Sequence, residues 1–210
     1  MQIPVFAHVA AASFLIPAGL GIRHWRTLHT SMKIFALFCI FSVLQVIAAF
    51  VLGKMGIPNQ FLSNIYMLFY VECVLLLFSR WTQRRFLKDA LVITGLIYFV
   101  FWILDVSFLP FPKDFRENID TGANAIMIIA SMIMLGQIAK HSENLITEYS
   151  TFWIAIGALL YSAGTITVTA NSNAILAMGI SFFNTLWHVV WGCSVIANLL
   201  YARSFLCKTF

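Results

Sequence analysis

Glu72 and His188 stand inside long apolar segments of the chain, far from any polar connection. A polar group in lipid is costly, so an intramembrane ionisable residue suggests a function. Desolvation favours the neutral acid form of Glu72 unless a cation pairs with it. Glu72 could accept a proton or orient a ligand, or it could be a protonated acid that only hydrogen-bonds a neighbouring helix. His188 is likewise either an interior, hydrogen-bonded histidine or a ligand.

Polar side chains recur at helical spacing in several of these apolar segments. Steps of three and four residues place them on one helix face, which predicts that the face meets the bundle interior or a wet cavity. The last segment has the clearest such seam, made of Ser181, Asn184, His188, Trp191, Val195 and Asn198. Shorter seams are Thr94, Tyr98, Trp102 and Asp105; Asp120, Asn124, Met127, Ser131 and Met134; and Tyr161, Thr165 and Thr169.

These seams predict a polar pocket that opens at the outer surface, with Glu72 near its floor. The predicted ligand-binding residues are Asn64, Tyr66, Glu72, Tyr98, Asp105, Asp120, Asn124, Thr165, Asn184, His188 and Trp191. The candidates for acid–base catalysis are Glu72, His188, Asp105 and Asp120, which an enzyme would bring together within one hydrogen-bonding shell. Asp105 and Asp120 lie near segment ends and could equally be solvated, and Asp120 could simply favour a helix amino terminus.

The elements that position these residues are membrane-spanning helices. Hydrophobic residues make up 61% of the 210 residues and charged residues only 10%, against about 25% charged residues in soluble domains. A water-soluble fold is therefore excluded, and a span needs roughly 20 apolar residues. The sequence predicts a single all-α domain over residues 1–210, a seven-transmembrane helix bundle with spans near 4–22, 32–53, 60–80, 88–109, 118–139, 150–170 and 177–203. Pro17 should kink the first span.

Lysine and arginine are unevenly divided between the two predicted sides of the membrane. Ten of them fall in the first, third and fifth connections and the carboxyl tail, whereas only Lys54, Lys113 and Arg116 fall on the other side. Cytoplasmic connections carry the excess, so we expect the amino terminus outside and the carboxyl terminus in the cytoplasm. The net charge of +5 then faces anionic lipid headgroups rather than nucleic acid. The basic connection 80–88 and the tail could dock a partner protein.

Residues of the last predicted helix bear on two cofactors that seven-helix proteins use, retinal and zinc. A retinal protein needs a lysine within its last helix, and this chain has none there, which excludes retinal. Zinc amidases of the alkaline ceramidase and adiponectin-receptor kind use HxxxH in the last helix, where this chain has Asn184 in place of the first histidine. Zinc would then need His8, His188 and Asp105 or Asp120, so we predict no metal site and no cofactor.

Two wider likenesses bear on function. At an offset of about 120 residues, Asn64 matches Asn184 and Cys73 matches Cys193. Carriers of the SWEET type have such a repeat, in a three-plus-one-plus-three arrangement of helices. Evenly spaced helices, however, produce the same offset by default. Asn64-Ile65-Tyr66 before Glu72, and His188 before Asn198-Leu199-Leu200-Tyr201, resemble uncharacterised seven-helix membrane proteins of Bacteroidota. That resemblance implies a bacterial inner membrane and no assigned activity.

We therefore expect a multi-pass protein that binds a small molecule or lipid in its pocket, as a sensor or an accessory subunit of a membrane complex. Two alternatives stay open: an intramembrane hydrolase that acts on a lipid-like substrate with carboxylates or a metal, and a small-solute carrier of the three-plus-one-plus-three helix type.

Overall fold

The computed structural model describes residues 4–57, 59–108, 117–141 and 145–207, and within these ranges the fold is all-helical. Lys113, Arg116 and Lys208, which contribute to the predicted orientation, lie outside them. Seven of the described helical segments are long and apolar enough to span a membrane. The chain is thus a multi-pass membrane protein, as predicted.

The helices follow the predicted spans to within a few residues. In chain order they are α1 (Val5–Ser13), α2 (Leu15–Arg23), α3 (Thr30–Lys54), α4 (Gln60–Trp81), α5 (Arg85–Phe108), α6 (Glu117–His141), the 3₁₀ turn η1 (Ile146–Glu148), α7 (Ser150–Thr169), α8 (Ser172–Ala177) and α9 (Ile180–Ser204). Together α1 and α2 form the first span.

Two spans are not single continuous helices, and a kink was predicted for the first of them. The first span is interrupted at Phe14, three residues before Pro17, and proline cannot donate the next helical hydrogen bond. At this break the Asn198 amide of α9 donates to the Ser13 hydroxyl at 2.8 Å. The last span begins later than predicted, because Gly179 adopts a positive φ of 114° and separates α9 from the short helix α8.

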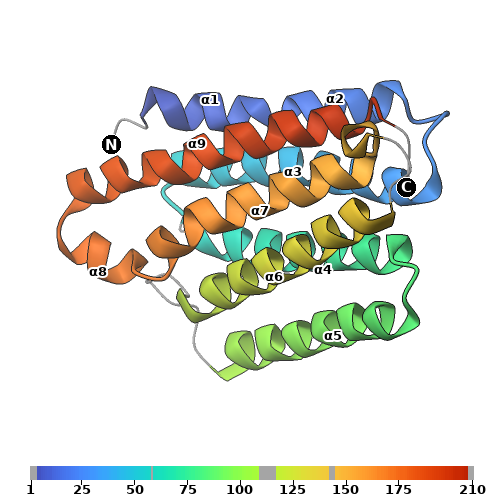
Figure 1. Cartoon of the computed structure of the whole chain (residues 1–210). Coiled ribbons are helices and arrows are strands. Elements are labelled where there is room, and N and C mark those ends of the chain that lie inside the picture. Colours follow the sequence, from blue (N-terminus) through green and yellow to red (C-terminus); the bar gives the residue numbers. More distant parts are fainter. Residues whose placement is uncertain (1–3, 58, 109–116, 142–144, 208–210) are drawn as a thin grey trace.

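Helix α7 lies between α9 and α6, and α5 lies at the edge of the bundle (Figure 1). Helix α7 packs most extensively against α9 and α6, while α5 packs on α4 and scarcely touches α6. The α1–α2 pair packs against α9 and α3. Every second connection returns to the same end of the bundle, which we call the basic end because Arg23, Arg84, Lys140 and Arg203 lie there. The other end, which carries Lys54, is the distal end.

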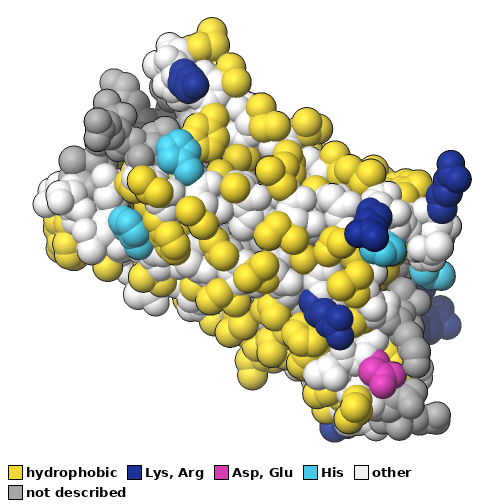
Figure 2. Space-filling model, turned by 90° about the horizontal axis from the view of Figure 1, so that it is seen from above, with side chains coloured by type: hydrophobic (Ala, Val, Ile, Leu, Met, Phe, Trp, Pro, Cys, Tyr) yellow, Lys and Arg dark blue, Asp and Glu magenta, His cyan; other side chains and the backbone are white. Residues whose placement is uncertain are grey.

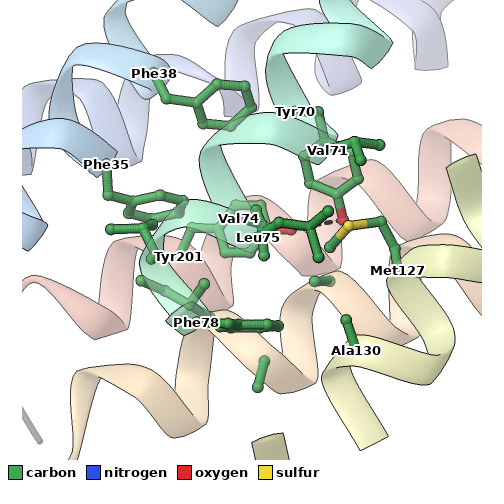
Figure 3. Packing of buried hydrophobic residues seen from close by; sticks show 14 of the residues in the cluster. Phe35, Phe38, Tyr70, Val71, Val74, Leu75, Phe78, Met127, Ala130 and Tyr201 are labelled. Atoms are coloured by element: carbon green, nitrogen blue, oxygen red, sulfur yellow. Dashed lines mark hydrogen bonds between the residues drawn. The ribbon is translucent and has the colours of Figure 1, made fainter. Parts of the chain in front are cut away.

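The core is built around aromatic side chains of α3, α4 and α9 (Figure 3). Phe35 is fully buried and packs edge-on against Tyr201, with ring centroids 5.2 Å apart. The hydroxyls of Tyr70 and Tyr201 lie 3.4 Å apart, which joins α4 to α9. Aromatic pairs in this geometry add to the energy of simple burial, so this cluster holds α3, α4 and α9 together.

The outer surface of the bundle is apolar over most of its length. Figure 2 shows hydrophobic side chains covering the visible face between charged groups that gather toward its ends. Large exposed side chains are most frequent on α5, where Leu96 and Ile97 are more than half exposed. Such a surface is stable only against lipid.

Candidate functional site

The interface between α4 and α5 places Glu72 near the middle of the membrane-spanning region. Glu72 lies 12 residues into α4, and its Oε2 is 2.9 Å from the position that a Cβ on Gly95 would occupy. Gly95 therefore lets the carboxyl group lie against the backbone of α5. Tyr98 follows Gly95 by one helical turn and is only 2% exposed, so both residues face α4.

Two oxygen atoms at this interface lack the hydrogen bonds that burial demands. The Oε1 of Glu72 and the hydroxyl of Tyr98 are buried, and neither has a partner among the described residues. A buried polar atom without a partner typically costs about 1–3 kcal/mol. Glu72 itself is only partly buried, so its side chain reaches the edge of the α4–α5 pair.

A second carboxyl group approaches the same place from α6. The Tyr98 phenol lies within electrostatic range of Asp120 and Glu72, and Tyr161 of α7 lies within range of Asp120. Long-range electrostatic interactions, with Tyr98 and Asp120 in the middle, thus connect four groups from four helices, which we call the acidic cluster: Glu72, Tyr98, Asp120 and Tyr161.

The polar residues next to Asp120 form a closed network. Asn124 is fully buried; its Oδ1 accepts a hydrogen bond from Thr165 at 3.3 Å and its Nδ2 donates to Thr169 at 3.2 Å. Both threonine hydroxyls also bond backbone carbonyls of α7. Asn124 and Thr165 therefore act as a satisfied link between α6 and α7, beside the acidic cluster and not as an open binding surface.

Two predicted site residues of α4 take part in packing. Tyr66 stacks near Phe38 and Tyr70 and meets Phe14 edge-on. The backbone carbonyl of Asn64 accepts a 3.3 Å hydrogen bond from the Trp102 indole, which fastens α5 to α4.

The predicted seam of α9 does not reach Glu72. His188 is exposed; its ring stacks on Phe6 of α1 at 5.7 Å and meets Trp191 edge-on at 5.0 Å. Its Nδ1 lies 2.6 Å from the carbonyl of Asn184 on the same helix. The expectation that the whole seam faces the interior is wrong here, because α7 packs against another side of α9 and only Asn198 of the polar residues is buried.

The four catalytic candidates therefore do not converge. Glu72 lies at the α4–α5 interface and Asp120 is near Tyr98, whereas His188 lies across the bundle against α1, and Asp105 is part-buried two turns beyond Tyr98 on α5. Within the described parts of the chain, no group of three or more His, Cys, Asp or Glu residues could hold a metal ion.

One pocket at the distal end lies where the sequence prediction did not place it. It encloses about 260 Å³ between the end of α3 and the start of α4, and its polar lining residues are Gln45 and Asn59. The Asn59 amide donates to the carbonyl of Ala49 at 2.8 Å, which ties the turn to α3. Gln45, an amide within an apolar run, was the available signal.

No family model matches this chain, and neither the curated proteins nor the solved structures include one with significant similarity to it.

Proposed function

We propose that the protein is a membrane-embedded binding protein that takes a lipid-soluble small molecule at the acidic cluster. One observation carries the proposal: Glu72 and Tyr98 each present, at the α4–α5 interface, a buried oxygen that has no partner among the residues the structure describes. A ligand that supplies a donor to Glu72 and a donor or acceptor to Tyr98 would remove both penalties, so such a ligand gains from binding there.

The route to this site favours a ligand dissolved in the membrane. Glu72 is part-exposed, and the surrounding surface of α5 is apolar, as at Leu96 and Ile97. A molecule with an apolar body and one hydroxyl, amine or carbonyl head matches these surroundings.

The cellular role follows from the same arrangement. In our proposal the amino terminus is outside and the carboxyl terminus in the cytoplasm of a bacterial inner membrane, because the basic end carries most of the lysine and arginine. The short connections leave little surface for signalling by this chain alone. We infer that it acts as a sensor or accessory subunit, with a partner at the basic connection 80–88 or the tail.

A carboxyl-specific probe tests the site. Dicyclohexylcarbodiimide is lipid-soluble and adds to protonated carboxyl groups, so the full-length protein in phosphatidylcholine nanodiscs should be modified at Glu72, as peptide mass spectrometry would show. Apolar extract of the host membrane, separated into fractions, should contain a component that protects Glu72. Tyr98→Phe should raise the concentration needed for protection roughly tenfold, as expected for one lost hydrogen bond.

The matched control is Tyr66→Phe, which removes a hydroxyl from the aromatic cluster of α4 and should leave protection unchanged. Absence of modification at Glu72, or protection by no fraction, would contradict the proposal.

A further inference from the structure

A second pocket lies at the basic end, away from the acidic cluster. It encloses about 310 Å³ where the start of α5 meets the end of α6. Arg84 lines it from the residue before α5, and Lys140 lines it from the last turn of α6. Two cations from different helices thus face one cavity at a level where the apolar surface ends.

The two cations of this pocket are not paired with a carboxylate in the described part of the chain. Neither Arg84 nor Lys140 forms an ion pair with a carboxylate among the residues that the structure describes, and both side chains are exposed. An anion from outside the chain would therefore meet two cations not already engaged, an arrangement that binds phosphate groups at membrane surfaces.

Apart from Gln137, the remaining walls of the pocket are apolar, and they continue toward the membrane interior. Leu87 lines the α5 side and Ile133 lines the α6 side. Lys140, Gly136, Ile133 and Ile129 follow one another at steps of four, three and four residues, which places them on one face of α6. Ile133 and Ile129 are exposed, and α5 scarcely touches α6. A cationic rim thus leads into an apolar stripe.

The pocket wall is held in place from α4. The hydroxyl of Thr82, at the end of α4, donates to Oε1 of Gln137 at 2.9 Å. Gln137 lines the pocket beside Gly136, so this bond fixes the α6 wall relative to the turn that carries Arg84.

We propose that this pocket binds an anionic phospholipid of the surrounding membrane. The headgroup phosphate lies between Arg84 and Lys140, and an acyl chain runs along Ile133 and Ile129. The occupant is a lipid rather than a soluble anion because the cations open directly onto an apolar stripe. The lipid fills the space that α5 and α6 leave between them and joins these two helices.

The test measures lipid retention by the full-length protein. The protein is reconstituted in nanodiscs with phosphatidylglycerol and phosphatidylcholine in equal amounts, released into the gas phase, and the retained lipid is identified by native mass spectrometry. Wild-type protein should retain phosphatidylglycerol preferentially. Arg84→Gln with Lys140→Gln should weaken that retention roughly thirtyfold, or about fivefold for each cation near an anionic headgroup.

The control is Arg23→Gln with Arg26→Gln, which removes the same charge from the same end of the bundle outside the pocket. It should retain phosphatidylglycerol as the wild type does. An equal loss in this control would show a general surface-charge effect and overturn the proposal, as would equal retention of both lipids by the wild type.

A third variant separates the lipid from a free anion. Gly136→Leu keeps both cations but fills the pocket. A Cβ at Gly136 would meet no atom within 4 Å, so we expect the variant to fold, and its unfolding transition checks this. Retention of phosphatidylglycerol should fall, whereas competing inorganic phosphate should not displace the lipid from wild-type protein. Unchanged retention in Gly136→Leu, or displacement by inorganic phosphate, would refute a lipid site.

Discussion

Helices α7 and α5 carry similar polar side chains in very different surroundings. Each has a tyrosine followed by further polar or aromatic residues at helical spacing, Tyr161 with Thr165 on α7 and Tyr98 with Trp102 on α5. In the most apolar stretch of each helix, 44% of the residues of α7 are buried but only 17% of those of α5. The same kind of sequence is therefore enclosed by neighbours in one case and largely bordered by lipid in the other.

The difference shows that the neighbouring helices decide whether a polar side chain is hydrogen-bonded within the protein or is left without a partner. On α7, Thr165 is bonded to Asn124 and to its own helix, and Gly157 allows close approach of α9. On α5, Tyr98 is buried as well, but its hydroxyl has no partner among the described residues. We infer that α7 stabilises the bundle and that α5 completes a binding site.

Replacing a glycine in each helix should sharpen this comparison most. A Cβ at Gly157 would lie 2.6 Å from the Tyr201 ring, which is packed in the core, whereas at Gly95 it would meet the mobile end of Glu72. Gly157→Ala should lower the free energy of unfolding by about 2 kcal/mol through overpacking. Gly95→Ala should change it little, since the carboxyl group can move and alanine favours helix. Detergent-titrated unfolding followed by tryptophan fluorescence measures both, and equal losses would break the distinction.

Removing a hydrogen-bonding side chain should change the free energy of unfolding less than the glycine replacement on α7 does, again with a larger loss at the α6–α7 contact than on α5. Asn124→Ala should lower the free energy of unfolding by about 1–2 kcal/mol, because it leaves two threonine hydroxyls with weaker bonding and opens a cavity. Tyr98→Phe should change it by less than about 0.5 kcal/mol, since the lost hydroxyl has no partner. The same unfolding assay decides; a larger loss for Tyr98→Phe would mean that this hydroxyl is structural.

The smallest expected change is an increase, not a decrease, in the free energy of unfolding. Glu72→Leu removes an unsatisfied buried oxygen and should raise the free energy of unfolding by about 0.5–1 kcal/mol while abolishing ligand protection. Glu72→Gln, which keeps a polar group of the same shape, is the control and should leave stability near that of the wild type. Destabilisation by Glu72→Leu would show that the carboxyl group holds the bundle together.

The helices could be predicted because length and apolar composition alone define membrane spans. The carboxyl group of Glu72 could also be singled out, since a polar group among leucines is visible in the sequence. Which helix would face Glu72 could not, because contact with Gly95 depends on how α5 packs. Gly95 itself has no side chain to signal a role.

The expectation that His188 faces the bundle interior was wrong for a related physical reason. Periodicity groups residues on one helix face but does not say which neighbour covers that face. Gly157 and Gly164 of α7 allow Tyr201 and Cys193 of α9 to approach closely. The side of α9 that carries these two residues therefore faces α7, and His188, on another side of α9, faces α1. The basic pocket was missed because Arg84 and Lys140 are far apart in the chain and were assigned only to orientation.

Because α5 lies at the edge of the bundle, the thickness of the bilayer affects the geometry of the proposed binding site. Its 24 residues span about 36 Å as a helix, against a hydrocarbon core of about 30 Å. With lipid around most of its circumference, α5 adjusts to such a mismatch by inclining rather than by deforming its neighbours. A thinner membrane would incline it further and change the separation of Tyr98 from Glu72, so that affinity for the ligand would report the mechanical state of the membrane.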